Sequence, residues 1–156
     1  MVDPTSHPDN SESPAATDKA ARDPLAILPG YTLRRAANAM MAELGALLGE
    51  VELRVSEASI LLLIDGRSTM TSSLIGAALD IRSANMAPLI SSLVARGLVE
   101  RVPLDGKSMA IVLTEPGRAV LARVRTITQD FEQTLMLRIP PEHRDHFVPA
   151  LNALWR

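Results

Sequence analysis

The chain has 156 residues, a formal net charge of −2 and no cysteine, which fits one domain with a helical appendage and excludes disulfides and thiolate metal sites. Hydrophobic residues make up 47% of the chain but aromatic residues only 3%, so the core must be aliphatic. The apolar run "ILLLI" is too short to span a membrane, and no signal-peptide pattern is visible. We therefore expect a cytoplasmic protein without membrane partners.

The small net charge hides an uneven distribution along the chain. Residues 1–23 carry five acidic and two basic residues, whereas residues 67–126 carry eight basic and four acidic ones. This asymmetry indicates that the central segment meets an anionic partner, although basic residues also simply solvate a surface.

The N-terminal part divides into a tail and a long helix. Residues 1–28 are rich in Pro, Ser, Asp and Ala without periodicity, which predicts a disordered tail. From Tyr31 onward, apolar residues recur at steps of four and three, the pattern of an amphipathic helix with a coiled-coil-like seam. The expected seam consists of Leu33, Ala37, Met40, Leu44, Leu47 and Val51.

Three shorter helices are expected next. The segment "VSEASILLLIDG" predicts a helix that is capped by Ser56 and stopped by Gly66. A short helix at Ser72–Leu79 should bury Leu74, Ile75, Ala78 and Leu79. A further helix should end at Arg96, before Gly97, and bury Met86, Leu89, Ile90, Leu93 and Val94.

Pro88 lies inside this last helix, where a proline removes a backbone donor and kinks the chain. It is tolerated if the helix begins near Asn85, because the N–H groups of a first turn have no helical partner.

The stretch "RVPLDGKSMAIVLT" contains Gly-Lys-Ser, the end of a nucleotide-binding phosphate loop. That loop needs a glycine five positions before Gly106 and a helix after it. The chain has Arg101 at that position and a β-prone run afterwards, so a nucleotide site is excluded.

Asp105-Gly106 between two β-prone runs predicts a hairpin with a two-residue type I′ turn. In that register Leu104 faces Lys107, Val102 faces Met109 and Leu98 faces Leu113. Lys107 would then follow the turn directly, at the most projecting point of the hairpin.

The C-terminal part predicts a second long helix, with Thr114 as its N-cap and Pro116 in its first turn. Its apolar stripe consists of Val120, Val124, Ile127, Phe131 and Leu135. Pro140-Pro141 interrupts it, and residues 141–156 should form a final short helix. The fold class is therefore mainly α with a small β-hairpin (α+β), in the element order of a winged helix-turn-helix.

The segment "TSSLIGAALDIRSANMAPLISSLVARGLVERVPLDGKSMAIVLTEPGRAVL" resembles the winged-helix core of the MarR family of bacterial transcriptional regulators. The strongest matches are "ARGLVER" (95–101), the wing tip Asp105-Gly106-Lys107 and "LTEPGRAVL" (113–121), while "YTLRRAANAM" (31–40) is similar to the first helix of some members. The resemblance covers about residues 30–140. It implies one domain at 29–156, with a winged core at about 55–115 between dimerisation helices at about 30–50 and 115–156.

The resemblance also implies a homodimer in which each protomer reads half of a pseudo-palindromic DNA operator. Carried over residue by residue, it assigns DNA contacts to Ser72, Ser73, Arg82, Ser83, Asn85, Met86, Arg101, Asp105, Lys107 and Ser108. Asn85 is the candidate for an adenine edge, since an amide both donates and accepts. Arg82 is assigned to a phosphate, and Lys107 to a minor groove. Arg82 and Asn85 could also be ordinary solvated residues, and Arg101 could pair with Asp105 instead of contacting phosphate.

Arg34 and Arg35, on the polar side of the first helix, are candidates for binding an anionic effector. The alternatives are a solvated surface or a phosphate clamp. The family suggests small aromatic or phenolic acids, or their thioesters, as effectors. His143 and His146 stand three apart, but two histidines without a third ligand rarely hold zinc. We expect neither a metal nor a cofactor.

The sequence thus predicts a homodimeric transcriptional repressor that a small ligand releases from double-stranded DNA. The alternative is a winged-helix protein-interaction module, in which Pro88 and the short wing weaken DNA contact and the acidic tail binds partners. An enzyme is not expected, since the chain lacks a nucleophile–base arrangement and a complete phosphate loop.

Overall fold

The computed structural model of the protein describes residues 23–155 and divides the chain into two compact units, residues 1–40 and 41–156. Of the expected tail, residues 1–22 lie outside the described residues. Residues 23–28 form turns, in which the N–H of Ala26 donates to the carbonyl of Asp23 at 3.0 Å and the N–H of Leu28 donates to that of Leu25 at 3.0 Å.

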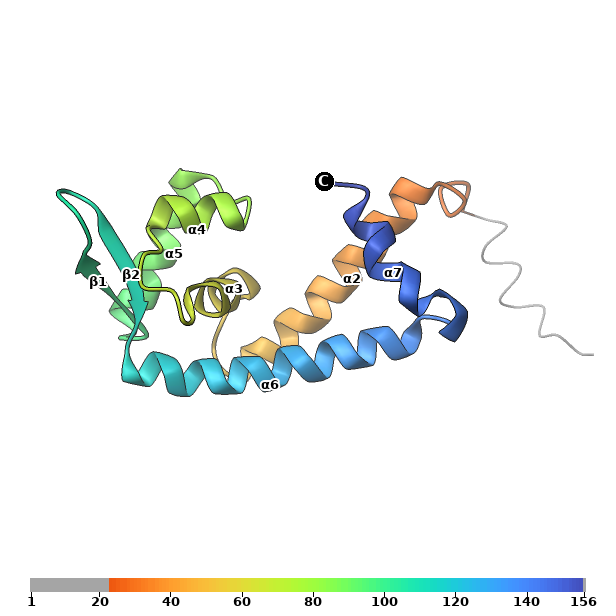
Figure 1. The fold of residues 1–156 in the computed structure, drawn as a ribbon. Coiled ribbons are helices and arrows are strands. Elements are labelled where there is room, and N and C mark those ends of the chain that lie inside the picture. Colours follow the sequence, from red (N-terminus) through yellow and green to blue (C-terminus); the bar gives the residue numbers. More distant parts are fainter. Residues whose placement is uncertain (1–22, 156) are drawn as a thin grey trace, which may run out of the picture. The chain divides into compact units, whose positions relative to one another are not determined.

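The described chain is mainly helical with one antiparallel hairpin, which confirms the predicted fold class (Figure 1). In chain order the elements are α2 (Pro29–Gly49), α3 (Val55–Ile64), α4 (Ser72–Ala78), α5 (Ser83–Ala95), β1 (Val99–Pro103), β2 (Met109–Leu113), α6 (Glu115–Arg138), the 3-10 helix η1 (Pro141–His143) and α7 (Arg144–Asn152). Among these described helices, none combines the length and apolarity needed to cross a bilayer.

The predicted seam of α2 is largely uncovered in the single chain. Leu33 is exposed, and Leu44 and Leu47 are half-buried. Leu48, which was not expected in the seam, is the buried residue of α2. Val51 is buried, but it lies in the turn that follows the helix.

Helix α3 is the centre of the core of residues 41–156. Its N-cap is Arg54, so the expected cap at Ser56 is wrong by two residues. It ends just before Gly66, whose positive φ of 67° stops the helix as predicted. The buried side chains of this core, four of them from α3 itself, are Leu48, Val51, Leu53, Ala58, Ile60, Leu61, Ile64, Met70, Ile75, Met86, Ile90, Leu93, Leu98, Val99, Ile111, Leu113, Leu121 and Val124.

Helix α4 begins after Thr71, whose hydroxyl accepts a hydrogen bond from the N–H of Leu74 at 3.3 Å. The expectation that Leu74 and Ala78 are buried is wrong, since both are exposed and Leu74 retains 52% of its surface. The helix instead contacts the core through Ile75 and Gly76. A Cβ at Gly76 would lie 2.9 Å from the carbonyl oxygen of Ile81. The backbone at Ile81 therefore packs directly against α4 at Gly76.

Helix α5 begins at Ser83 and not near Asn85, so Pro88 is its sixth residue and lies beyond the first turn. The start near Asn85 that would place the proline in the first turn is therefore not observed. Pro88 has no N–H to give to the carbonyl of Ala84, four residues earlier. Met86, Ile90 and Leu93 are buried as expected, whereas Val94 is exposed and Leu89 only half-buried.

The hairpin forms at the predicted place but in a different register. Val99 pairs with Leu113, Val102 with Ala110 and Pro103 with Met109, one residue away from the expected partners. The N–H of Leu104 donates to the carbonyl of Ser108 at 3.0 Å, which leaves a three-residue loop in place of the expected two-residue turn. Gly106 in this loop has a φ of +54°.

The hairpin is attached to the segment before α4 and to the start of α6. The N–H of Ile111 donates to the carbonyl of Met70 at 2.8 Å, beside the start of α4. Thr114 caps α6 as predicted, accepting from the N–H of Gly117 at 3.0 Å, and its hydroxyl donates to the carbonyl of Gly97 at 2.6 Å. On α6, Val124 and Phe131 are buried as expected, together with Leu121, while the remaining stripe residues are half-buried.

Candidate nucleic-acid interface

The N-terminal turn of α5 presents the predicted helical contacts. Arg82 is the N-cap and is exposed, as are Ser83 and Asn85. The N–H of Asn85 donates to the carbonyl of Arg82 at 2.9 Å, so the turn is formed and its side chains project from a regular helix. These three polar residues therefore lie together at one end of α5 (Figure 1).

Met86 does not belong to this surface. Its side chain is 1% exposed and packs against Gly76. A Cβ built on Gly76 would lie 3.0 Å from the Cγ of Met86. A side chain buried between α4 and α5 cannot reach a DNA groove. The prediction of Met86 as a DNA contact is wrong, and its place in the predicted buried stripe is correct.

Ser72 and Ser73 begin α4, directly after its N-cap Thr71. Ser73 is exposed and Ser72 is half-buried, so both hydroxyls are open to solvent to different degrees.

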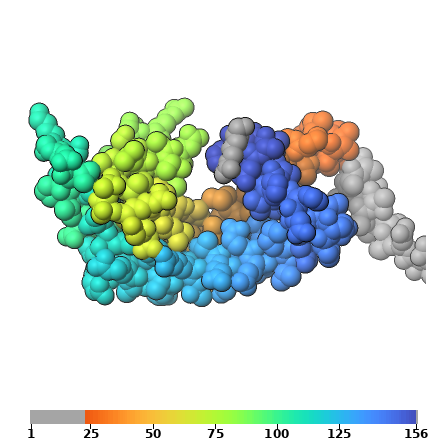
Figure 2. Space-filling model, in the orientation of Figure 1, coloured from red at the N-terminus to blue at the C-terminus, as the bar shows by residue number. Residues whose placement is uncertain are grey.

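The hairpin tip carries Asp105, Gly106 and Lys107 in its three-residue loop, all of them exposed. Lys107 therefore lies within the turn, whereas it was expected one residue past the turn. The N–H of Ser108 donates to the carbonyl of Asp105 at 2.8 Å and closes the loop. In the space-filling view this tip protrudes beyond the helices beside it (Figure 2).

Arg101, in β1, is exposed opposite the buried Ile111. In the described part of the chain it makes no ion pair with Asp105. The phosphate contact of Arg101 stays a prediction.

The basic residues of the positive segment fall into two groups. One group is ion-paired: Arg96 lies 4.0 Å from Glu57, Arg118 lies 3.1 Å from Glu115, and Arg125 pairs with Asp65. The other group, Arg67, Arg82, Arg101, Lys107 and Arg123, has no acidic partner among residues 23–155. The unpaired group includes all three cations that were predicted to contact DNA, so these side chains can meet phosphate without breaking an ion pair.

Arg34 and Arg35 form a cluster with Tyr31 in the N-terminal unit. Their guanidinium carbons lie 5.0 and 5.8 Å from the centroid of the Tyr31 ring, within cation–π range. Arg35 also pairs with Asp23 at 2.9 Å.

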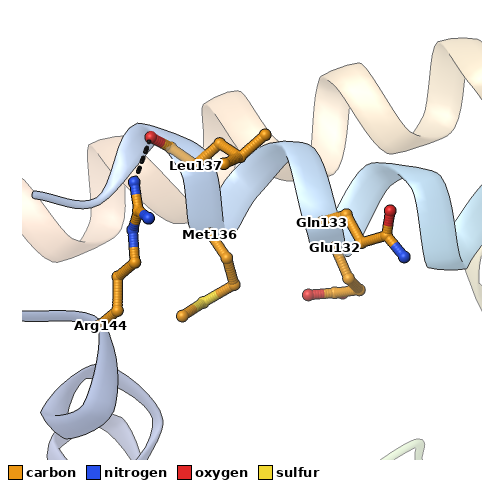
Figure 3. Close-up of a pocket in the computed structure, with 5 residues that line it drawn as sticks. All are labelled: Glu132, Gln133, Met136, Leu137 and Arg144. Atoms are coloured by element: carbon orange, nitrogen blue, oxygen red, sulfur yellow. Dashed lines mark hydrogen bonds between the residues drawn. The ribbon is translucent and has the colours of Figure 1, made fainter. Parts of the chain in front are cut away.

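A cavity of about 450 Å³ that was not predicted lies between the end of α6 and α7. It is lined by Glu132, Gln133, Met136, Leu137 and Arg144, and the Arg144 guanidinium donates to the carbonyl of Leu137 at 3.2 Å (Figure 3). No motif signals it, because its residues come from two helices that Pro140-Pro141 separates. Elsewhere, no three histidine, cysteine or carboxylate side chains of residues 23–155 come together to hold a metal ion.

Two consecutive short helices, an exposed polar turn on the second and a protruding hairpin define a winged helix-turn-helix protein. No protein-family model matches the sequence, and no curated protein matches it either. Solved structures do match.

The transcriptional repressor CouR bound to a 23-mer DNA duplex is 30% identical, with a TM-score of 0.78 over 85% of this chain and 95% of that one. A MarR-family transcriptional regulator from Rhodococcus sp. RHA1 is 21% identical, with a TM-score of 0.72 over 80% and 90%. CouR from Rhodococcus jostii RHA1 bound to p-coumaroyl-CoA is 22% identical, with a TM-score of 0.74 over 83% and 93%. The chain belongs to the MarR family of transcriptional regulators. The alternative of a protein-interaction module is not favoured.

Proposed function

We propose that this chain is a homodimeric repressor that binds a pseudo-palindromic operator and leaves it when a small ligand binds. The observation that carries the proposal is the pair of exposed cationic sites on one lobe, Arg82 at the start of α5 and Lys107 at the hairpin tip, both without an acidic partner in the described chain. A recognition helix and a wing that carry free cations suit a major groove and the adjacent minor groove. CouR, the 30% identical neighbour, is a repressor bound to DNA.

In this proposal α5 enters the major groove. Asn85 contacts an adenine edge, with Ser83 beside it, while Arg82 binds a phosphate. Lys107 enters the minor groove, where negative potential attracts a cation, and Asp105 and Ser108 shape the loop that holds it. The remaining assigned residues, Arg101, Ser72 and Ser73, contact the DNA backbone.

Dimer formation is supported by apolar surface on the C-terminal helices. Leu137 and Leu154 are 70% and 68% exposed, and Val148 is exposed as well. Burying such side chains against a second copy removes apolar surface from water. The dimer would place two α5 helices on successive major grooves, about 34 Å apart.

For the effector we propose a small aromatic or phenolic acid or its thioester, since CouR from Rhodococcus jostii is bound to p-coumaroyl-CoA. Arg34 and Arg35 remain the candidates for its anionic part. Arg34 is the better candidate, because Arg35 already forms an ion pair with Asp23 at 2.9 Å. Release requires only that the ligand bind the geometry without DNA more tightly. The proposal assigns no catalytic step, and a regulator of bacterial chromosomal DNA acts in the cytoplasm.

The test is binding of the full-length chain to the DNA upstream of its own gene, measured by fluorescence anisotropy at 50–200 mM salt. A dimer that neutralises several phosphates loses affinity steeply as salt rises, by roughly 10³-fold over this range for six contacts. Light scattering on the same samples measures the oligomeric state. A monomer, or no binding even at the lowest salt concentration, contradicts the proposal.

The effector is tested by titrating p-coumaroyl-CoA and free p-coumarate into the protein–DNA complex. Release by either compound, weakened in the Arg34→Ala variant, supports the assignment. Release that is equally strong in Arg34→Ala removes Arg34 from the effector site and leaves the DNA-binding proposal untouched.

A further inference from the structure

The recognition helix is unusual in carrying no ionisable side chain. All thirteen residues from Ser83 to Ala95 are uncharged. The nearest cations are its two caps, Arg82 and Arg96. Arg96 is turned toward the protein, since its guanidinium donates to the carbonyl of Glu52 at 2.8 Å and lies 4.0 Å from Glu57.

The buried stripe fixes which residues face outward. Met86, Ile90 and Leu93 point into the core. At about 100° per residue, the opposite side of the helix carries Ala84, Pro88, Ser91 and Ala95. All four are exposed, as are Asn85 and Ala87 at the edges of this side. The outward side is therefore small and mostly apolar, with one amide.

This composition limits which bases the helix can read. Guanine is most often read by the two-pronged contact of an arginine or lysine, which the outward side of α5 lacks. Thymine presents a C5-methyl group in the major groove, and small apolar side chains contact it. Asparagine suits adenine, the partner of thymine. The Pro88 ring adds methylene groups, and its missing N–H leaves no backbone donor there.

We propose that α5 reads an A·T-rich half-site, with Ala84, Ala87 and Pro88 in contact with thymine methyl groups and Asn85 in contact with an adenine. The inference rests on the proposed operator binding and names the base pairs that lie under this helix. The small side chains let the helix axis approach the floor of the groove, and discrimination comes from methyl contacts in place of guanine hydrogen bonds.

The experiment starts from a random 24-base-pair duplex library from which the full-length protein selects its own sites. Thymines of the selected duplex are then replaced one at a time by deoxyuridine, which removes only the C5-methyl group. Each contacted methyl should contribute about fourfold in affinity, from about 0.8 kcal/mol per buried carbon. Replacements outside the half-sites should change nothing.

Selected half-sites with G·C pairs at the positions read by α5, or affinities that deoxyuridine leaves unchanged, overturn the inference while operator binding stands. A library from which no sequence is enriched, with no binding at low salt, overturns the proposed function itself. The two failures are thereby distinguishable.

Pro88→Ala provides the protein side of the test, since it removes two ring carbons and restores a helical N–H. At one thymine in each half-site, the loss of affinity on replacement by deoxyuridine should then fall from about fourfold to below twofold. Pro116→Ala is the control, because Pro116 is also an exposed proline in a helix but lies in the first turn of α6, far along that helix from Leu137. The control variant should still lose about fourfold in affinity at each contacted thymine that deoxyuridine replaces. An unchanged pattern in Pro88→Ala overturns the assignment of Pro88 to the reading surface.

Discussion

The carboxylate of Glu57 in α3 accepts a hydrogen bond of 2.8 Å from the hydroxyl of Ser92 in α5. Glu57 is only 5% exposed, and its second oxygen accepts from the N–H of Arg54 at 3.0 Å. Arg96, the C-cap of α5, lies 4.0 Å away. One buried carboxylate therefore ties the start of α3 to the C-terminal half of α5, which holds the recognition helix on the core.

Replacing Glu57 should lower the stability of the lobe. Glu57→Ala leaves the Ser92 hydroxyl and the Arg54 N–H without their acceptor and removes the carboxylate beside Arg96, at a cost of about 2–4 kcal/mol in the free energy of unfolding. Glu57→Gln keeps a neutral acceptor and should lose less. Urea denaturation measures both. Glu115→Ala is the control, since Glu115 is highly exposed and its pair with Arg118 is worth less than about 1 kcal/mol. Equal losses for Glu57→Ala and Glu115→Ala would contradict the role of Glu57.

The two free cations should contribute to operator affinity, and a paired one should not. Arg82→Ala and Lys107→Ala should each weaken binding and reduce the slope of log affinity against log salt by about 1. Arg118→Ala is the comparison, because its guanidinium already lies 3.1 Å from Glu115. Anisotropy titrations at four salt concentrations give the slopes. A slope that stays unchanged in both Arg82→Ala and Lys107→Ala would show that neither side chain neutralises a phosphate.

Gly117 should tolerate no side chain. A Cβ at this position would lie 1.9 Å from the carbonyl oxygen of Leu98, where the start of α6 meets the end of α5 and the hairpin. Gly117→Ala should therefore destabilise the protein by about 1–3 kcal/mol or more. Gly45→Ala is the matched control, since Gly45 lies in helix α2 and its Cβ would meet only Val55 of α3 at 3.8 Å, an ordinary van der Waals contact. Thermal denaturation should show a large loss for the first variant and none for the second.

The ion pair between Glu43 and Arg138 should make stability depend on acid pH. The Arg138 guanidinium donates to both carboxylate oxygens of Glu43, at 2.6 and 2.7 Å, and this hydrogen bonding lowers the pKa of Glu43 below its usual 4.5. A carboxyl group whose pKa is lower in the folded state stabilises the fold above its unfolded pKa. That contribution is lost as the pH falls through the lowered value.

Wild type should therefore exceed Glu43→Gln in melting temperature near pH 7, and the difference should shrink as the pH falls below about 4.5. Melting curves between pH 7 and pH 3 measure it. A difference that stays constant across this range would show that Glu43 is not held ionised by Arg138.

The sequence by itself determined the kinds of element and their order, because these depend on neighbouring residues. Thr114 and Pro116 mark the start of α6, Gly66 stops α3, and the Asp105-Gly106 pair places the hairpin loop. A cap, a positive φ and a turn each involve groups within a few residues of one another. The same local signals predicted that Arg82, Asn85 and Lys107 would be exposed.

Only the tertiary structure decided the register, the burial and the charge pairing. The hydrogen bonds around Leu104 and Ser108 shifted the hairpin by one residue, and the packing of α4 through Ile75 and Gly76 left Leu74 exposed. Arg96 and Arg125 find their acidic partners more than 30 residues away along the chain, at Glu57 and Asp65. Whether a cation is neutralised or free for DNA therefore depends on distances between segments that no local pattern encodes, because electrostatic attraction acts through space and not along the chain.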